Sequence, residues 1–305
     1  MQYALICMNR IMVMLLLLLL GYICYKKEIV DSHTCKKLSA FLLDIVSPII
    51  ILASYQSEFS LDKLKGLGIA LIMSAAAFAA ADFISRIVIK KNPNDYIEKF
   101  ACIFSNCLFM GMPLIQGILG KEGVFYLTAF WSVSNLLVWT YGVLLMRGKF
   151  SREVAAGAIK SPAVAAIFIG FIFFIFQIKI PLFLLEPMEI IGDLNTPLAM
   201  ITAGASIAQT NLFQVILKKR IYYISFIKLF LIPIVMILLT RFLPIPHNIF
   251  LTVNVLLACP TAANVTLFSL RYDKNYVYAT EIFAMTTIIS LISMPLMVLL
   301  IEAGY

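Results

Sequence analysis

Runs of apolar residues follow one another along almost the whole chain, and short polar segments separate them. A helix needs about 20 mainly apolar residues to cross the hydrocarbon layer of a membrane. The expected fold class is therefore an all-α integral membrane protein with ten transmembrane helices. We place these helices at residues 11–25, 38–55, 66–89, 100–119, 124–146, 162–177, 190–208, 221–239, 249–270 and 276–301.

Pairs of prolines inside these runs occur at similar spacing in the two halves of the chain. Pro48 and Pro113 are 65 residues apart, and Pro197 and Pro260 are 63 residues apart. A proline removes a backbone hydrogen bond, and hydrocarbon offers no water to replace it, so a broken helix survives at membrane depth only inside the protein. Paired interruptions in the two halves of a chain indicate a transport site.

This duplication divides the chain into three parts. We expect a first five-helix repeat at 1–147, a cytoplasmic connector at 148–161 and a second five-helix repeat at 162–305. Because five is an odd number, the second repeat enters the membrane from the side opposite to the first, so the two repeats are inverted.

The distribution of basic residues predicts the orientation. Seventeen Lys and Arg follow odd-numbered helices, six lie on the other side, and Lys228 falls inside the eighth helix. Basic connections stay in the cytoplasm, so both termini are expected outside the cell membrane. Arg10, at the start of the first helix, is expected to reach the outer interface.

The composition excludes a soluble protein. Hydrophobic residues make up 62% of the chain and charged residues 13%, and the mean hydropathy is +0.97. The net charge of +8 lies in the short connections, where it sets topology, and no nucleic-acid partner is expected. Membrane lipid is the expected surrounding.

The fourth and ninth predicted helices contain polar residues beside Gly111, Pro113 and Pro260. If these helices unwind there, each second half starts with free backbone N–H groups that carry roughly half a positive charge. Such helix starts attract anions, and neighbouring amide and hydroxyl groups orient them. The candidate substrate-binding residues are Ser105, Asn106, Pro260, Thr261 and Asn264.

Two acids stand four residues before a proline, Asp44 in the second predicted helix and Asp193 in the seventh. Intramembrane acids are costly and often bind cations or protons. They are candidates for H⁺ or Na⁺ coupling, and the alternative is that they cap a broken helix. Lys228 either snorkels or pairs with an acid, and Glu281 is expected at the interface. Gly204 marks a close approach between helices.

Three segments together resemble the auxin efflux carrier family of permeases. They are Ser105-Asn106 through Phe109-Met110-Gly111 to Pro113-Leu114, Thr196-Pro197-Leu198-Ala199-Met200 through Ala203-Gly204, and Pro260-Thr261-Ala262-Ala263-Asn264. The resemblance covers essentially the whole chain. It implies a fold similar to the bile acid sodium symporters, with helices 4 and 9 broken and crossing.

The resemblance further implies a scaffold of helices 1, 2, 6 and 7 and a mobile transport domain of helices 3–5 and 8–10. Substrates of the family include malonate, malate and auxin, so a small organic anion is the implied partner. Asn106 would form one side of the site, and Pro260, Thr261 and Asn264 the other. The chain departs from the family pattern at Leu108, where members often have Gly, and at Asp44, where many have Asn.

These features favour a secondary transporter that works by alternating access. A non-transporting ligand sensor is an alternative, disfavoured because no soluble signalling domain is evident. A membrane-embedded enzyme is a weaker one, since the two histidines, His33 and His247, lie in connections and no catalytic or metal-ligand motif is present. No cofactor or resident metal is expected, and a homodimer remains open.

Overall fold

The computed structural model describes residues 2–148, 162–210 and 212–303, and in them all regular structure is helical. Only Gly148 of the expected connector is among them; the rest of the connector lies outside the described residues. The helices of the first part are α1 (Gln2–Lys26), α2 (Ser32–Phe41), α3 (Ser47–Ser54), α4 (Leu61–Val88), α5 (Asp95–Ile103), α6 (Met112–Leu137) and α7 (Val143–Arg147).

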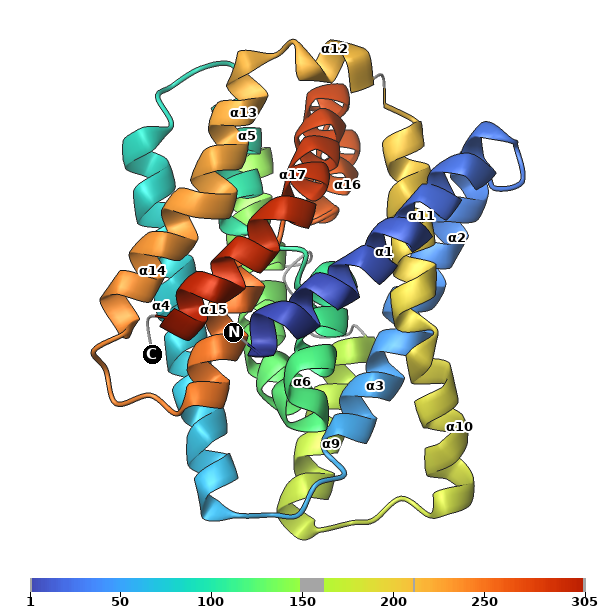
Figure 1. Ribbon diagram of the computed structural model, residues 1–305, viewed down its shortest axis with the longest axis vertical. Coiled ribbons are helices and arrows are strands. Elements are labelled where there is room, and N and C mark those ends of the chain that lie inside the picture. The colour runs from blue at the N-terminus through green and yellow to red at the C-terminus, as the bar shows by residue number, and fades with distance from the viewer. Residues whose placement is uncertain (1, 149–161, 211, 304–305) are drawn as a thin grey trace.

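The helices of the second part begin after the connector. They are α9 (Pro162–Phe176), α10 (Leu182–Asp193), α11 (Asn195–Ala208), α12 (Leu212–Ile216), α13 (Lys219–Phe226), α14 (Ile232–Thr240), α15 (His247–Ala258), α16 (Asn264–Arg271) and α17 (Tyr276–Ala303). Figure 1 shows most of them running along the long axis of the molecule, with α1 and α17 inclined across it.

Six helical segments of the described residues are long and apolar enough to cross a membrane: Leu5–Lys26, Ser32–Ser54, Leu61–Val88, Cys107–Arg147, Lys219–Thr240 and Tyr276–Ala303. Pro162–Phe176 and His247–Ala258 are apolar but shorter. The protein is therefore a multi-pass membrane protein by helix length and composition.

Several of the ten predicted helices are divided in the structure, which explains the smaller number of long segments. The predicted seventh helix corresponds to two helices in the structure. The first, α10, begins earlier than predicted, and Leu194 separates it from the second, α11. The long segment Cys107–Arg147 contains Gly120, whose φ of 64° breaks the helix between the predicted fourth and fifth helices.

Wide, π-helical turns precede three of the prolines. They occupy Leu42–Val46, Cys107–Gly111 and Ile227–Leu231, ahead of Pro48, Pro113 and Pro233. A proline in a helix lacks the N–H that would bond to the carbonyl four residues earlier, and its ring clashes with that carbonyl. In each case that carbonyl belongs to the middle residue of the wide turn, so the turn relieves the clash. A fourth wide turn, Val138–Gly142, has no proline.

Two glycines bring α1 and α11 into backbone contact. A Cβ on Gly204 would lie 1.9 Å from the Leu18 carbonyl oxygen, and a Cβ on Gly21 would lie 2.1 Å from the Ile201 carbonyl oxygen. Only glycine fits such a crossing, so the expected close approach at Gly204 is confirmed. Figure 1 shows α1 beside α11 along this contact.

The centre of the molecule is formed by α15 and the helical turns that follow α5. Every residue of α15 from Ile249 to Ala258 is buried, as is every residue of the wide turn Cys107–Gly111. Large apolar side chains point outward instead on the outer helices, for example Phe83, Phe168 and Phe183. This arrangement suits a protein whose outer surface faces lipid and whose interrupted helices are enclosed.

Candidate functional site

Two helices are interrupted near the centre of the molecule. Residues 104–106 separate α5 from the wide turn that leads into α6, and residues 259–263 separate α15 from α16. We call these two segments together the junction. The sequence predicted an interruption at both places, and the structure confirms it. Hydrocarbon cannot satisfy the backbone groups that such breaks release, so their partners must come from the protein.

The two segments of the junction satisfy each other. Ser105 and Thr261 face one another as an antiparallel bridge, and the Asn106 N–H donates to the Pro260 carbonyl oxygen at 2.8 Å. A second backbone bond of 2.9 Å runs from the residue after Thr261 to the residue before Ser105. The predicted site residues Ser105 and Asn106 are thus in direct contact with Pro260 and Thr261, although about 155 residues lie between the two pairs in the chain.

Gly111 allows this close approach. A Cβ at Gly111 would lie 2.5 Å from Leu256 Cδ2 and 3.2 Å from Cys259 Sγ, both of which belong to the other broken helix. The Cys259 backbone is extended, with φ −58° and ψ 152°, because the following Pro260 disfavours helical geometry in its predecessor. Glycine on one helix and proline on the other therefore shape the junction.

The side chains at the junction are buried and polar. Ser105 Oγ donates to the Leu257 carbonyl at 3.1 Å, and Thr261 Oγ1 donates to the Ala101 carbonyl at 3.0 Å. Asn106 is 7% exposed, and its buried Nδ2 has no hydrogen-bond partner among the described residues. A buried amide donor without a partner costs about 1–3 kcal/mol, so a ligand that accepted this hydrogen bond would recover that energy.

Each interrupted helix resumes with its N-terminal end at the junction. Asn106 precedes the turn that leads into α6, and neither its side chain nor any other caps that start. Asn264 is half-buried and opens α16, which also has no side-chain cap. Uncapped helix starts carry partial positive charge and free N–H groups, and both features attract an anion.

A buried lysine lies beside the junction. Lys228, in the wide turn between α13 and α14, is 0% exposed, and its Nζ donates to Ser105 Oγ at 2.7 Å and to the Leu257 carbonyl at 3.4 Å. None of the described acids forms an ion pair with it. The sequence did not indicate which group Lys228 contacts. The only signals were its position in an apolar run and the proline five residues later.

A cavity of about 310 Å³ borders one side of the broken helix α6. Its lining comes from α1, from the first turns of α6 and from the boundary between α10 and α11. These residues are Arg10, Val13, Met14, Pro113, Gln116, Gly117, Asp193 and Thr196. Arg10, expected only at the interface, lies against Gly117, where a Cβ would come within 2.6 Å of the arginine Nε. The cavity is therefore polar on several sides.

The two candidate coupling acids lie outside the junction. Asp193 is exposed and lines the cavity, and Asp44 is exposed in its wide turn and forms no hydrogen bond or ion pair with any described residue. A neighbour of Asp193 comes closer to the junction: Asn195 is 2% exposed and its Nδ2 donates to the Leu108 carbonyl at 3.5 Å. Asn195 thus connects α11 to the turn that leads into α6.

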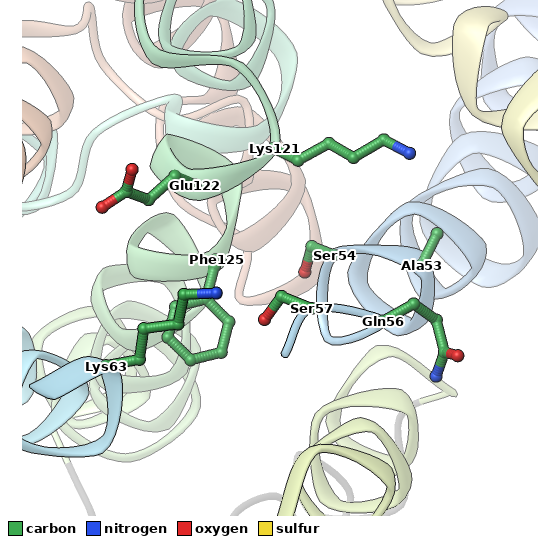
Figure 2. Close-up of a pocket in the computed structure, with 8 residues that line it drawn as sticks. All are labelled: Ala53, Ser54, Gln56, Ser57, Lys63, Lys121, Glu122 and Phe125. Atoms are coloured by element: carbon green, nitrogen blue, oxygen red, sulfur yellow. The ribbon is translucent and has the colours of Figure 1, made fainter. Parts of the chain in front are cut away.

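Another cavity, of about 210 Å³, lies between the end of α3, the start of α4 and the part of α6 that follows Gly120 (Figure 2). Lys63 and Lys121 line it, but both have partners, the Glu58 carbonyl and the Glu189 carboxylate. Figure 2 shows Lys121 and its neighbour Glu122 pointing to opposite sides. With its basic groups engaged, this cavity offers less to a ligand than the first.

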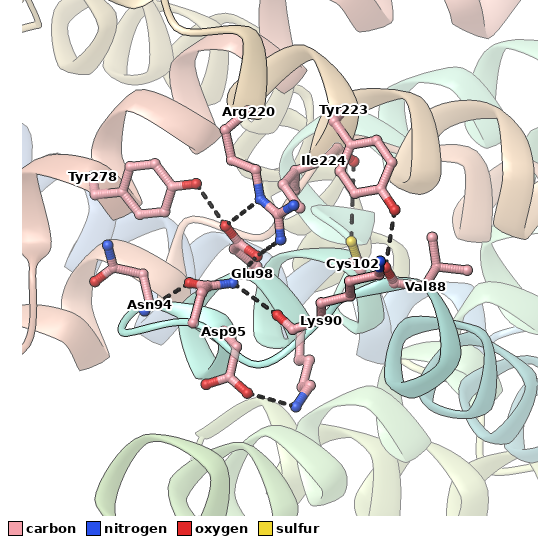
Figure 3. Close-up of polar contacts among 12 residues, drawn as sticks. Val88, Lys90, Asn94, Asp95, Glu98, Cys102, Arg220, Tyr223, Ile224 and Tyr278 are labelled. Atoms are coloured by element: carbon pink, nitrogen blue, oxygen red, sulfur yellow. Dashed lines mark hydrogen bonds and ion pairs between the residues drawn. The ribbon is translucent and has the colours of Figure 1, made fainter.

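Ion pairs join α5, α13 and α17 at one end of the molecule (Figure 3). Glu98 is 1% exposed, and Arg220 donates to both of its oxygens, at 2.9 and 2.6 Å. Tyr278 donates to the same carboxylate at 2.8 Å. Glu281 is buried and paired with Lys218 at 2.6 Å. Nothing in the sequence singled out Glu98, since it lies beside Lys99 just before the predicted fourth helix.

Comparison with known proteins agrees with this architecture. No curated protein matches the chain. A family model described as membrane transport protein matches it twice, at residues 6–156 and 149–298, and so covers most of its length. The chain therefore belongs to this membrane transport protein family, which is the family of the auxin efflux carriers.

Proposed function

We propose that this membrane transporter is a secondary carrier that binds a small organic anion, such as a mono- or dicarboxylate, at the junction. The observation that carries the proposal is the buried Asn106 Nδ2, which has no hydrogen-bond partner among the described residues and lies where two helix starts meet. Lys228 lies one hydrogen bond away, at Ser105, and would be cationic beside a bound anion. A carboxylate would accept from the amide and from the helix starts and would lie close to the positive charge.

The ten predicted helices would form two inverted repeats, 1–147 and 162–305, with both termini outside the cell membrane. Two contacts support the division into a scaffold and a transport domain. Gly21 and Gly204 hold α1 against α11 within the scaffold. Glu98 and Arg220 join α5 to α13 within the transport domain. Each group of helices is therefore held together by its own contacts.

The 310 Å³ cavity supports alternating access. It lies between α1 and α11, which would belong to the scaffold, and the first turns of α6, which would belong to the transport domain. Movement of one group against the other would change the size of this cavity. The junction itself is buried in this structure, so such movement would be needed to bring Asn106 into contact with water. An ion gradient of H⁺ or Na⁺ would drive the cycle.

Uptake into proteoliposomes tests the proposal. Radiolabelled malonate, malate and indole-3-acetate would be offered in turn, with pH, Na⁺ and voltage gradients imposed separately. We expect saturable uptake by the wild type, lost in Asn264→Ala and retained in Asn248→Ala, since Asn248 lies at the far end of α15 and bonds to Glu122. Binding of these anions without uptake under any gradient would indicate a sensor instead.

A further inference from the structure

Among the residues that the structure describes, Lys228 has no counter-ion of the kind that a buried ammonium needs. Both of its hydrogen-bond partners are neutral, the Ser105 hydroxyl and the Leu257 carbonyl. An ammonium carries three N–H donors, whereas a neutral amine carries two. The two bonds at Lys228 therefore use every donor of a neutral amine and leave one donor of an ammonium without an acceptor.

The groups around Lys228 do not supply negative charge. The titratable groups that face it are three buried thiols: Cys102 of α5, Cys107 of the wide turn before α6, and Cys259 of the junction. The helices α13, α14, α15 and α17, which also pack against its turn, place no described ionised group against it. The buried carboxylates of α5 and α17, Glu98 and Glu281, are already paired with Arg220 and Lys218.

Whether Lys228 is protonated depends on whether an anion is bound at the junction. Burying a charge without a partner costs several kcal/mol, so the empty site favours the neutral amine. An anion bound at Asn106 would lie next to Ser105, which accepts the Lys228 hydrogen bond. In this low-dielectric interior the negative charge would stabilise the protonated lysine strongly. Anion binding and proton binding thus favour each other, by equal free energies.

We propose that Lys228 gains a proton when an organic anion occupies the junction and loses it when the anion leaves, so that one proton accompanies each anion. This rests on the proposed function and names its coupling ion. The proton comes from water on the side to which the site is open, and it is returned to water on the other side with the anion. Lys228 acts through Ser105 and the electrostatic field, and it positions charge rather than reacting.

Proton uptake on ligand binding tests this directly. Malonate would be added to the purified protein in weakly buffered detergent solution near pH 9, with a pH-sensitive dye recording proton uptake and calorimetry recording binding. We expect the wild type to take up about one proton per malonate bound. The exposed lysine on the same helical segment supplies a matched control, Lys219→Met, which should behave as the wild type does.

Two substitutions of Lys228 should separate charge from protonation. Lys228→Arg keeps a permanent positive charge, so it should bind malonate without proton uptake and without the wild-type dependence on a pH gradient. Lys228→Met removes the charge, so binding should weaken by about tenfold or more and take up no proton. Proton uptake equal to that of the wild type in both variants would overturn the inference.

Failure of the inference differs from failure of the proposed function. A wild type that binds and transports malonate without proton uptake would refute only the role of Lys228. A wild type that binds neither malonate, malate nor indole-3-acetate would refute the proposed function.

Thermal unfolding of the ligand-free protein tests the protonation of Lys228 separately. The unfolded chain binds a proton at this lysine that the empty folded site excludes. Falling pH should therefore lower the Tm of the wild type relative to that of Lys228→Met. A Tm difference that stays constant from pH 9 to pH 5 would refute this.

Discussion

A substitution of Asn106 should weaken ligand binding without lowering the stability of the folded protein. Its Nδ2 is buried and has no described partner, so Asn106→Ala removes no hydrogen bond from the folded protein. We expect a Tm that is unchanged or higher, because the variant no longer buries an unpaired donor, and a loss of malonate affinity of about 10- to 100-fold, the value of one hydrogen bond to a charged group. Paired thermal-unfolding and binding measurements on the purified variant would check both.

Asn248→Ala is the matched control for this residue, because it also removes an asparagine but at the exposed end of α15. It should leave affinity unchanged. A fall in Tm of Asn106→Ala with unchanged affinity would show that Asn106 is structural, and the proposed site would have to be moved.

The residues of the junction were predictable in part. The small polar residues beside proline and glycine marked Ser105, Asn106 and Thr261 because such residues are expensive inside a membrane helix. Lys228 could not be assigned, since its contact with Ser105 spans 123 residues and depends on which face of its helix turns inward. That face is set by tertiary packing, which the local pattern of a mostly apolar run does not reveal.

At the scale of the helices, the ion pair between α5 and α13 predicts that losing one partner destabilises the protein more than losing the other. Glu98 is buried, whereas the Arg220 side chain is 41% exposed. Arg220→Met leaves a buried carboxylate without its cation and should destabilise the protein by about 3–5 kcal/mol. Glu98→Gln leaves an arginine that water can reach and should cost about 1–2 kcal/mol.

Thermal unfolding of both variants in the same detergent would measure this order. Asp95→Asn, which removes a partly exposed helical pair with Lys99 on the same α5, serves as the control and should change stability little. A larger loss of Tm in Glu98→Gln than in Arg220→Met would contradict the assignment of the buried charge to Glu98.

The contact between α1 and α11 predicts a packing defect. A Cβ on Gly204 would lie 1.9 Å from a backbone oxygen of α1, which cannot move aside as a side chain can. Gly204→Ala should therefore separate the helices and cost about 1–3 kcal/mol. Gly68→Ala is the matched control, because a Cβ there meets nothing within 4 Å, and its Tm should stay equal or rise slightly. Equal melting of the two variants would show that the helices do not pack as described.

The all-helical fold was predicted correctly, and the local geometry inside the helices was not. Apolar runs fixed where most helices lie, because the membrane requires long apolar segments. The wide turns before Pro48, Pro113 and Pro233 were missed, since a proline announces a disturbance but not whether the helix kinks, breaks or widens. At Pro260 the helix breaks, and the segment that satisfies the break comes from the other half of the chain.

For the whole molecule, the sequence predicted a duplication and a meeting of its two halves, and the junction joins residues from both. The division into a scaffold and a transport domain stays a prediction, because one conformation does not reveal which helices move together. The cavity between them offers a way to test it. Gln116 lies on α6 and Thr196 on α11, and both line this cavity.

Joining these two helices should stop transport if the two groups move against each other. In a background without the six native cysteines, Gln116→Cys with Thr196→Cys, bridged by a short bifunctional thiol reagent, should reduce malonate uptake by at least about tenfold, because alternating access requires relative motion. Glu122→Cys with Asn248→Cys provides the control, since α6 and α15 would both belong to the transport domain and already meet at 3.0 Å. Cleavage of a reducible bridge should restore uptake. Full activity of the bridged 116–196 variant would place α6 and α11 in one rigid body, and the helices that move would then have to be assigned differently.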